Sequence, residues 1–331
     1  MRPSLVHASR SQAMDAEDRD TGSAGDLGLK LRGVGRVSIA MKWALVLLTI
    51  SGIAHAENST LSADVAFLAS PDLDGRAAGS DGDTKARTYI KKRMTDAGLT
   101  TIDQGFDFDK TETANLIGYI TGDTDDIIII GAHYDHLGDG HLGANDNASG
   151  VAAMLAIADA IKAKGGKPHR TIAFAAWGAE EEGMIGSAFY AAHPPSELPM
   201  DKVVEYINLD MVGSYSSKGF VAAMGSFPKL PARKLLDKLV THYPKTHVGL
   251  GGRAARSDHA AFCDAGIPYV FFWTPDASCY HEKCDKPSKI DLKHMADITA
   301  LAGDLAWELS ESKKDLIGSR KKLGCFASLK K

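Results

Sequence analysis

One stretch of the chain joins a buried strand to a helix through a loop that is rich in potential ligands. The strand is the run of isoleucines at 127–130, and the helix follows from an apolar pattern between Val151 and Ile161. The loop contains Gly-Ala-His-Tyr-Asp-His-Leu-Gly at 131–138 and Gly-Ala-Asn-Asp-Asn-Ala-Ser-Gly at 143–150. A strand–loop–helix unit of this kind predicts an α/β fold, and it carries two candidate metal ligands, His133 and Asp146.

The segments around this unit alternate between strand and helix patterns. We expect strands at 115–120, 127–130, 171–177, 203–209 and 269–273, and helices at 148–162, 187–192, 229–241, 257–264 and 292–309. An earlier helix is expected to begin at Asp83 or Thr84 and to end at Gly98. Residues 214–227 show no clear pattern. The alternation predicts a largely parallel sheet covered by helices on both faces, within one domain.

Residues 41–56 have the features of a secretory signal peptide. A lysine is followed by an apolar stretch and by the small-residue pattern Ala54-His55-Ala56. The apolar stretch is shorter than the roughly 20 residues that a membrane span requires. We expect export to a periplasm or to the medium, and no membrane attachment of the mature protein.

The signal peptide divides the chain into four expected parts. Residues 1–40 form an unstructured upstream extension or a gene-start error, with translation beginning at Met41. Residues 41–56 are the signal peptide, 57–311 the folded domain, and 312–331 a basic, solvated C-terminal tail.

The charge and cysteine content limit the partners that the chain favours. A net charge of −4 gives no strong field for nucleic acid or for an anionic membrane. Cys279 and Cys284 flank His281, and export permits a disulfide between them, although two free thiols fit the sequence equally. No second thiol pair at zinc-finger spacing accompanies them, so they are poor zinc ligands.

Carboxylates and imidazoles follow several of the predicted strands. In an open α/β sheet, ligands bind beyond the carboxyl ends of the strands, so these side chains should converge there. The residues concerned are His133 and Asp135 after 127–130, Glu180 and Glu181 after 171–177, Asp210 after 203–209, His281 after 269–273, and Asp146 before the long helix.

Five motifs resemble those of the secreted di-zinc aminopeptidases. This family includes bacterial leucyl aminopeptidase and aminopeptidase Y and, more distantly, glutamate carboxypeptidase II and glutaminyl cyclase. The motifs are Gly-Ala-His-Tyr-Asp at 131–135, the segment 143–150, Ala-Glu-Glu-Glu-Gly-Met-Ile-Gly-Ser at 179–187, Asn-Leu-Asp-Met at 208–211 and Tyr-His at 280–281. The resemblance covers about residues 60–305 in the family's order. It implies a three-layer α/β/α zinc-exopeptidase fold with a central, largely parallel mixed sheet, and so a zinc aminopeptidase domain at 57–311.

The resemblance also implies a centre of two Zn²⁺ ions per chain. Asp146 would bridge the ions. His133 and Asp210 would complete one site, and Glu181 and His281 the other. Carboxylate and imidazole ligands without a thiolate suit zinc.

The remaining site residues are assigned by the same resemblance. Glu180 would be the general base, and Asp135 the carboxylate that fixes the tautomer of His133. In the run of three glutamates, Glu180 and Glu181 align with the family's glutamate pair. Gly183 and residues 186–187 fix this alignment and leave Glu182 outside it. A possible substrate pocket comprises Arg256, Ser257, Asp258 and His259, although Ser257 as a helix N-cap is an equally ordinary explanation. His136 and His141 lie near the first ligand motif but match no ligand position, so we expect them at the surface or as supports of the ligands.

The implied activity is removal of N-terminal residues from peptides by a metal-activated water. Three alternatives remain on the same fold: a carboxypeptidase, a glutaminyl-cyclase-like transferase with one zinc ion, and a non-catalytic binding domain. Retention of every ligand position and of Glu180 favours the aminopeptidase.

Overall fold

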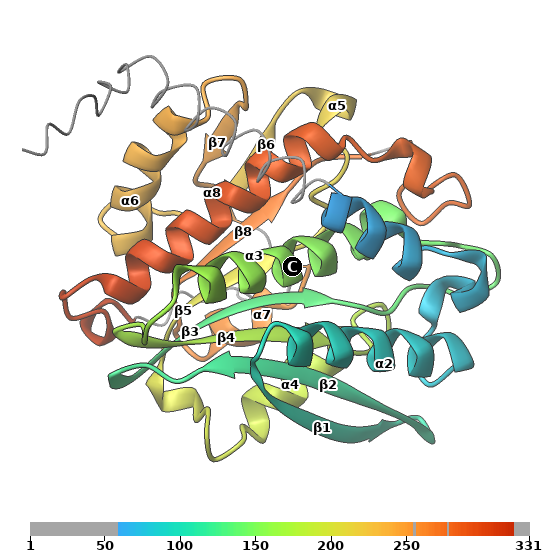
Figure 1. Ribbon diagram of the computed structural model, residues 1–331, viewed down its shortest axis with the longest axis horizontal. Coiled ribbons are helices and arrows are strands. Elements are labelled where there is room, and N and C mark those ends of the chain that lie inside the picture. Colours follow the sequence, from blue (N-terminus) through green and yellow to red (C-terminus); the bar gives the residue numbers. More distant parts are fainter. Residues whose placement is uncertain (1–58, 254–255, 277, 321–331) are drawn as a thin grey trace, which may run out of the picture. The chain divides into compact units, whose positions relative to one another are not determined.

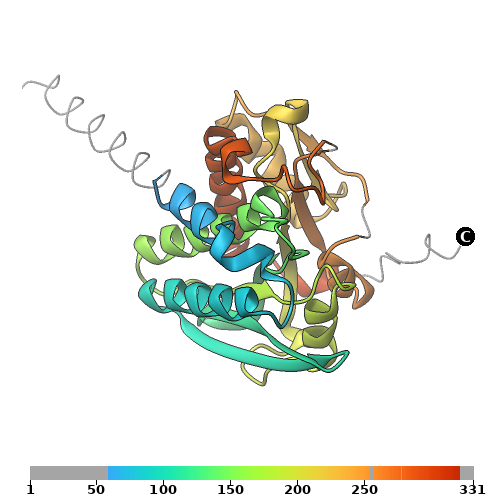
Figure 2. The ribbon, with the colours of Figure 1, turned by 90° about the vertical axis from the view of Figure 1, so that its right-hand side faces the viewer.

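The computed structural model describes residues 59–253, 256–276 and 278–320, which fold as a mixed sheet between two layers of helices (Figures 1 and 2). The expected extension at 1–40, the expected signal peptide at 41–56 and residues 321–331 of the expected tail lie outside the described residues. Within those described ranges, every helix falls short of the length and apolar character that a membrane span needs.

The sheet has its parallel strands at the centre. In the described residues it contains eight strands in the order β1-β2-β4-β3-β5-β8-β6-β7. The neighbours β4, β3, β5 and β8 are parallel, as are β6 and β7, whereas the pairs β1–β2, β2–β4 and β6–β8 are antiparallel. The expected mixed, largely parallel sheet is confirmed. The strands are β1 (Thr100–Phe108), β2 (Thr111–Ile120), β3 (Thr124–His133), β4 (Arg170–Trp177), β5 (Val203–Leu209), β6 (Val221–Met224), β7 (Val248–Leu250) and β8 (Tyr269–Trp273).

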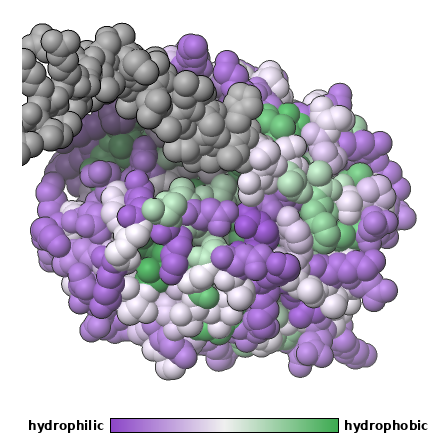
Figure 3. All heavy atoms as spheres, viewed as in Figure 1, coloured by the Kyte–Doolittle hydropathy of each residue, from purple (hydrophilic) through white to green (hydrophobic). Residues whose placement is uncertain are grey.

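Helices cover both faces of the sheet. One apolar core lies beneath α2 (Asp81–Asp96), α3 (Ser149–Lys164), α6 (Pro231–Leu239) and α8 (Leu292–Glu311). The other lies beneath α4 (Ile185–Ala192) and α7 (His259–Asp264). Shorter elements include the 3-10 segment η1 (Pro71–Arg76) and α5 (Tyr215–Lys218). Where the described residues are in view in Figure 3, this side of the molecule is mostly hydrophilic, with hydrophobic residues in separate groups.

The isoleucine run explains why β3 lies at the centre of the sheet. Ile128 and Ile130 join the core beneath α3, and Ile127 and Ile129 join the opposite core. All four side chains are buried, and each contributes about 1.5–3 kcal/mol of hydrophobic stabilisation. A strand that is apolar on both faces therefore needs helices on both sides, which fixes the three-layer arrangement.

Two helix starts differ from the expected ones. Helix α2 begins at Asp81, where Ser80 Oγ accepts a hydrogen bond from the backbone amide of Asp83. Asp83 is unavailable as a cap because its carboxylate is buried and accepts a hydrogen bond from the Tyr134 hydroxyl. Helix α7 begins at His259, and Ser257 makes a contact within the site instead of capping the helix.

The first part of the expected tail is held against the domain. The guanidinium of Arg170 donates hydrogen bonds to the carbonyl oxygens of Leu309, Ser312 and Lys314. Leu316 is almost fully buried. A buried arginine thus binds the backbone of this segment, while the side chains of Lys313 and Lys314 are exposed, and the solvated charged tail stays a prediction.

Glu205 on β5 makes the stability of the fold depend on pH. Its side chain is fully buried, and one carboxyl oxygen has no hydrogen-bond partner among the described residues. Burial raises the pKa of Glu205 to about 8 from 4.5. The unfolded chain loses this proton first, so the contribution of Glu205 to stability falls as the pH rises from about 4.5 to about 8.

We therefore expect Glu205→Gln to gain stability relative to the wild type as the pH is raised. The difference in unfolding free energy should grow by a few kcal/mol between pH values of about 5 and 9, at about 1.4 kcal/mol per pKa unit. Urea unfolding of both proteins at the two pH values measures this change. A difference that does not vary with pH would show that Glu205 ionises normally.

Candidate metal centre

Asp146 lies at the centre of the site and faces two histidines. Its Oδ1 is 3.3 Å from Nε2 of His133, which ends β3. Its Oδ2 is 3.2 Å from Nε2 of His281, in the loop after β8. The two oxygens of one carboxylate therefore point to two different ligand groups.

Each histidine also contacts a second carboxylate. His133 Nε2 is 3.4 Å from Oδ1 of Asp210, directly after β5, and His281 Nε2 is 3.0 Å from Oε2 of Glu181, beyond β4. Zinc bonds of about 2.0–2.1 Å in a tetrahedron separate the ligand atoms by roughly 3.3 Å. The four distances around Asp146 thus suit two adjacent zinc ions, one on each side of its carboxylate.

The chemistry of these groups also fits cations. Asp210 Oδ1 is buried and, among the described residues, lacks a hydrogen-bond donor. Contacts with Asp146 and Glu181 raise the pKa of His281 to about 10. Burial opposes a positive charge on His133, yet the carboxylates of Glu180 and Asp210 raise its pKa. The site therefore stabilises positive charge in a buried setting, as a metal centre requires.

The loop that carries Asp146 is fixed from two directions. The Asp285 carboxylate accepts hydrogen bonds from the backbone amides of Asn145 and Asp146, at 2.8 and 2.9 Å. The Asn147 side chain donates to the carbonyl of Leu209 at the end of β5. The sequence analysis missed Asp285, although its place four residues after His281 is a usable signal.

A disulfide closes the loop that carries His281. Cys279 and Cys284 are bonded, which decides between the two states that the sequence left open. Asp285, which accepts the hydrogen bond from the backbone amide of Asp146, follows Cys284 directly. His281 and Asp285 therefore belong to one short segment. Its position is therefore tied to that of the central carboxylate.

Asp135 acts on different atoms from those expected. Its carboxylate is 3.8 Å from Nδ1 of His133, too far for a hydrogen bond, and His133 Nδ1 instead lies 3.2 Å from the backbone carbonyl of Asp135. The Asp135 carboxylate accepts hydrogen bonds from the backbone amides of Glu180 and Glu181. The backbone of Asp135 thus orients the histidine, and its side chain positions the glutamate pair.

A chain of hydrogen bonds ends on Asp210. Trp177 donates to the Tyr206 hydroxyl, which donates to Asn208. Asn208 donates to Ser257 Oγ, which donates to Asp210 Oδ2 at 2.8 Å. Asp210 Oδ2 is occupied in this way, which leaves Oδ1 turned towards His133.

A cavity of about 450 Å³ opens onto these groups. Glu180 lines it without belonging to either ligand group, and burial raises the pKa of Glu180. Of the four expected pocket residues, Arg256 lines the cavity, whereas Ser257, Asp258 and His259 are fully buried behind its wall. The ring of His259 packs against the rings of Tyr269 and Phe271.

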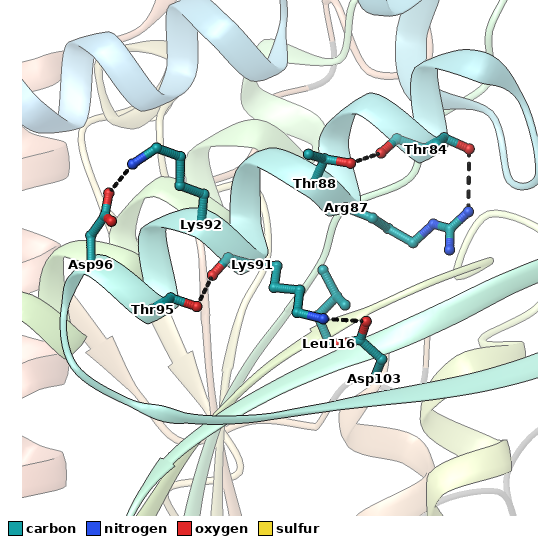
Figure 4. A pocket seen from close by; sticks show the side chains of 9 residues that line it. All are labelled: Thr84, Arg87, Thr88, Lys91, Lys92, Thr95, Asp96, Asp103 and Leu116. Atoms are coloured by element: carbon teal, nitrogen blue, oxygen red, sulfur yellow. Dashed lines mark hydrogen bonds and ion pairs between the residues drawn. The ribbon is translucent and has the colours of Figure 1, made fainter.

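A second cavity, between α2 and the first strands, has no free charge to offer a ligand. All three cations that line it are paired. Arg87 pairs with Asp83 at 2.9 Å, and Figure 4 shows the pairs of Lys91 with Asp103, at 2.8 Å, and of Lys92 with Asp96, at 2.5 Å. The cavity at Asp146, by contrast, combines open space with an unpaired ligand atom, Oδ1 of Asp210.

The sequence of this region matches a known family. The model of peptidase family M28 matches residues 115–306, more than half of the chain. The chain belongs to peptidase family M28. The resemblance in the five motifs is thus confirmed at the level of the family, and the match contains all of the central ligand residues.

Individual M28 relatives agree with this assignment. Leupeptin-inactivating enzyme 1 of Streptomyces exfoliatus is 32% identical over 71% of this chain and 58% of its own length. An aminopeptidase of Pseudomonas aeruginosa is 31% identical over 55% of this chain and 38% of its own length. The chain therefore spans little more than half of the first relative and less than half of the second.

The fold is that of a solved M28-like structure. A zinc aminopeptidase from Bacillus subtilis superposes with a TM-score of 0.70 and 17% identity, over 78% of this chain and 96% of that one. The three-layer α/β/α arrangement is confirmed by this likeness.

One buried arginine ties the N-terminal part of this M28 chain to the site. The Arg76 guanidinium donates to the carbonyl oxygens of Leu68, Tyr134, Leu142 and Gly143, and it is fully buried. The side chain of Arg76 thus holds both ends of the loop between His133 and Asp146. Burial lowers the pKa of Arg76 to about 10, and the site carboxylates oppose that shift.

We expect Arg76→Met to lower the unfolding free energy by about 3–5 kcal/mol, because it leaves several buried carbonyl groups without a donor. Arg76→Lys keeps the charge, so it should lower the unfolding free energy by less. Lys92→Met is the matched control, because this cation is exposed and its removal should cost less than about 1 kcal/mol. Urea unfolding measures all three, and equal losses for Arg76→Met and Lys92→Met would refute the role of Arg76.

Proposed function

We propose that this chain is a zinc-dependent aminopeptidase that hydrolyses N-terminal residues from peptides. The observation that carries this proposal is the central carboxylate of Asp146, whose two oxygens face two separate histidine–carboxylate groups. His133 and Asp210 would hold one Zn²⁺ ion, and Glu181 and His281 the other. When bound, two ions of this kind polarise the scissile carbonyl and lower the pKa of a water.

The side chains around these ligands support a hydrolytic reaction. Glu180 lines the cavity and is no ligand, so it is free to take a proton from water and to return it to the leaving amine. A pKa raised by burial suits a carboxyl group that must be protonated in mid-reaction. Asp135 fixes the backbone of Glu180 and so sets the direction of that carboxylate.

The charges in the cavity favour an amine over a carboxylate as the bound terminus. Of its five lining carboxylates, Asp146, Glu181 and Asp210 would be held by the proposed zinc ions, which leaves Glu180 and Asp276 outside the ligand set. Among its described lining residues, Arg256 is the one lysine or arginine. A carboxypeptidase needs a cationic site for the substrate's C-terminus, so this balance supports an aminopeptidase.

The rest of the cavity wall suits an apolar first residue. Met224, Phe271, Trp273 and Pro275 line it beside Met211. Burying an apolar side chain against such a wall gives about 25 cal/mol per Å² of buried area. We therefore propose a preference for leucine, methionine or phenylalanine over charged first residues.

We also propose that the protein is exported to a periplasm or to the medium and that residues 57–311 form the aminopeptidase domain. The support is the signal-peptide pattern at 41–56 and the end of α8 at Glu311. An N-terminal sequence of the mature protein that begins before Glu57 would contradict this division.

A panel of aminoacyl anilides tests the activity. The purified protein beginning at residue 57 should cleave apolar anilides at least about 10-fold faster than charged ones, a difference of about 1.4 kcal/mol. N-acetylated anilides should resist cleavage, and chelation followed by zinc should abolish and restore the activity. Cleavage of N-acetylated substrates would point to another peptidase class, and binding of a single zinc ion would favour the cyclase alternative.

A further inference from the structure

His136 is a buried histidine that matches no ligand position of the family motifs, although it lies close enough to Asp146 and Glu181 to share a metal ion with them. It lies in the loop after β3 and is 2% exposed. A Cβ atom on Gly143 would lie 2.6 Å from two carbon atoms of the His136 ring. Glycine at 143 therefore makes room for this ring beside the loop that carries Asp146.

The ring of His136 contacts one oxygen of Glu181. Nδ1 of His136 is 2.6 Å from Glu181 Oε1, and Glu181 Oε2 is 3.0 Å from Nε2 of His281. An ionised carboxylate only accepts hydrogen bonds, so His136 donates its Nδ1 proton. The two oxygens of Glu181 thus have different partners.

On the opposite side of the site, the two oxygens of Asp210 also have different partners. Asp210 Oδ2 accepts a hydrogen bond from Ser257, and Asp210 Oδ1 is 3.4 Å from Nε2 of His133. In both cases, a donor outside the ligand set occupies one carboxylate oxygen and leaves the other directed at a histidine. His136 therefore contacts one oxygen of Glu181 in the same way as Ser257 contacts one oxygen of Asp210.

We infer that His136 is a positioning residue that holds Glu181 for one-oxygen coordination of the second metal ion. This inference rests on the proposed two-zinc site. Nε2 of His136 is buried without a hydrogen-bond partner among the described residues, so Nδ1 carries the interaction of the ring with the site. Removal of the donor leaves Glu181 Oε1 without this partner, and the carboxylate is then free to rotate.

Zinc titration of His136 variants tests the inference. His136→Ala should lower the affinity for one of the two zinc ions by about 10- to 100-fold and leave the affinity for the other unchanged. Loss of a hydrogen bond to a metal ligand typically has an effect of this size. His136→Asn places an amide donor near the position of Nδ1 and should restore most of that affinity. His136→Gln, with the amide one carbon farther out, should not.

His141→Ala is the matched control. His141 lies in the same loop and is partly buried, and its Nδ1 contacts the backbone of Gly138 and no site carboxylate. Its loss should leave both zinc affinities unchanged. Calorimetric titration against a competing chelator gives the two affinities, and thermal unfolding of the zinc-free proteins reports loss of packing separately.

The possible results separate the explanations. Equal zinc affinities in His136→Ala and the wild type, with lower thermal stability alone, would reduce His136 to a packing residue and overturn the inference. Loss of one zinc in His136→Asn as well as in His136→Ala would make His136 a direct ligand, which also overturns it. A wild-type protein that binds fewer than two zinc ions would instead refute the proposed function itself.

Discussion

Replacement of Glu180 by glutamine will lower kcat by about 10²- to 10⁴-fold and leave the zinc content of the protein unchanged. The glutamine cannot accept a proton from water, yet it removes no ligand, because Glu180 belongs to neither group around Asp146. Steady-state kinetics on an apolar aminoacyl anilide and metal analysis of the same sample measure the two quantities.

Glu182→Gln is the control for this substitution. Glu182 is two residues away and exposed, and it lines no part of the cavity at Asp146. Its replacement should change neither kcat nor zinc content. If Glu180→Gln lost zinc along with activity, Glu180 would be a ligand and the assignment of the general base would be wrong.

Replacement of Asp146 by asparagine will have the second large effect, because it acts on both ions together. One carboxylate serves both sites, so each zinc affinity should fall by at least about 100-fold, more than the loss of an outer hydrogen bond causes. Asp210→Asn should instead lower the affinity for one zinc ion alone. Zinc titration distinguishes the two patterns.

The same substitution should remove the effect of chelation on stability. A metal that binds the folded state stabilises it, so chelation should lower the melting temperature of the wild type and leave Asp146→Asn unchanged. Asp139→Asn, an exposed carboxylate in the same loop that pairs with Lys283, should behave like the wild type. Independent loss of single ions in Asp146→Asn would contradict a bridging role.

The sequence predicted the parts of the fold that depend on local apolar pattern. Strands β5 and β8 have the expected bounds, and β3 contains the isoleucine run. Strand β1 was missed because it is an edge strand with a single buried side chain, so burial leaves little pattern in its sequence. Strands β6 and β7 are too short for a periodic signal.

The site was predictable to the extent that strand ends determine it. The expected ligands converge as the topology requires, because four parallel strands end at one edge. They are His133, Asp146, Glu181, Asp210 and His281. The hydrogen bonds between loops were not predictable. Arg76 binds residues about 60 positions away, and Asp285 binds amides about 140 positions away. A local sequence pattern cannot predict such contacts, because they form only when distant loops come together in the folded protein.

Anomalous diffraction from crystals of the zinc-loaded protein tests the central claim most directly. Data collected above and below the zinc edge should show two peaks roughly 3.5–4 Å apart, with the Asp146 carboxylate between them. One peak should contact His133 and Asp210, and the other Glu181 and His281. A single peak, or two peaks that do not share Asp146, would contradict the two-metal centre on which the proposed function depends.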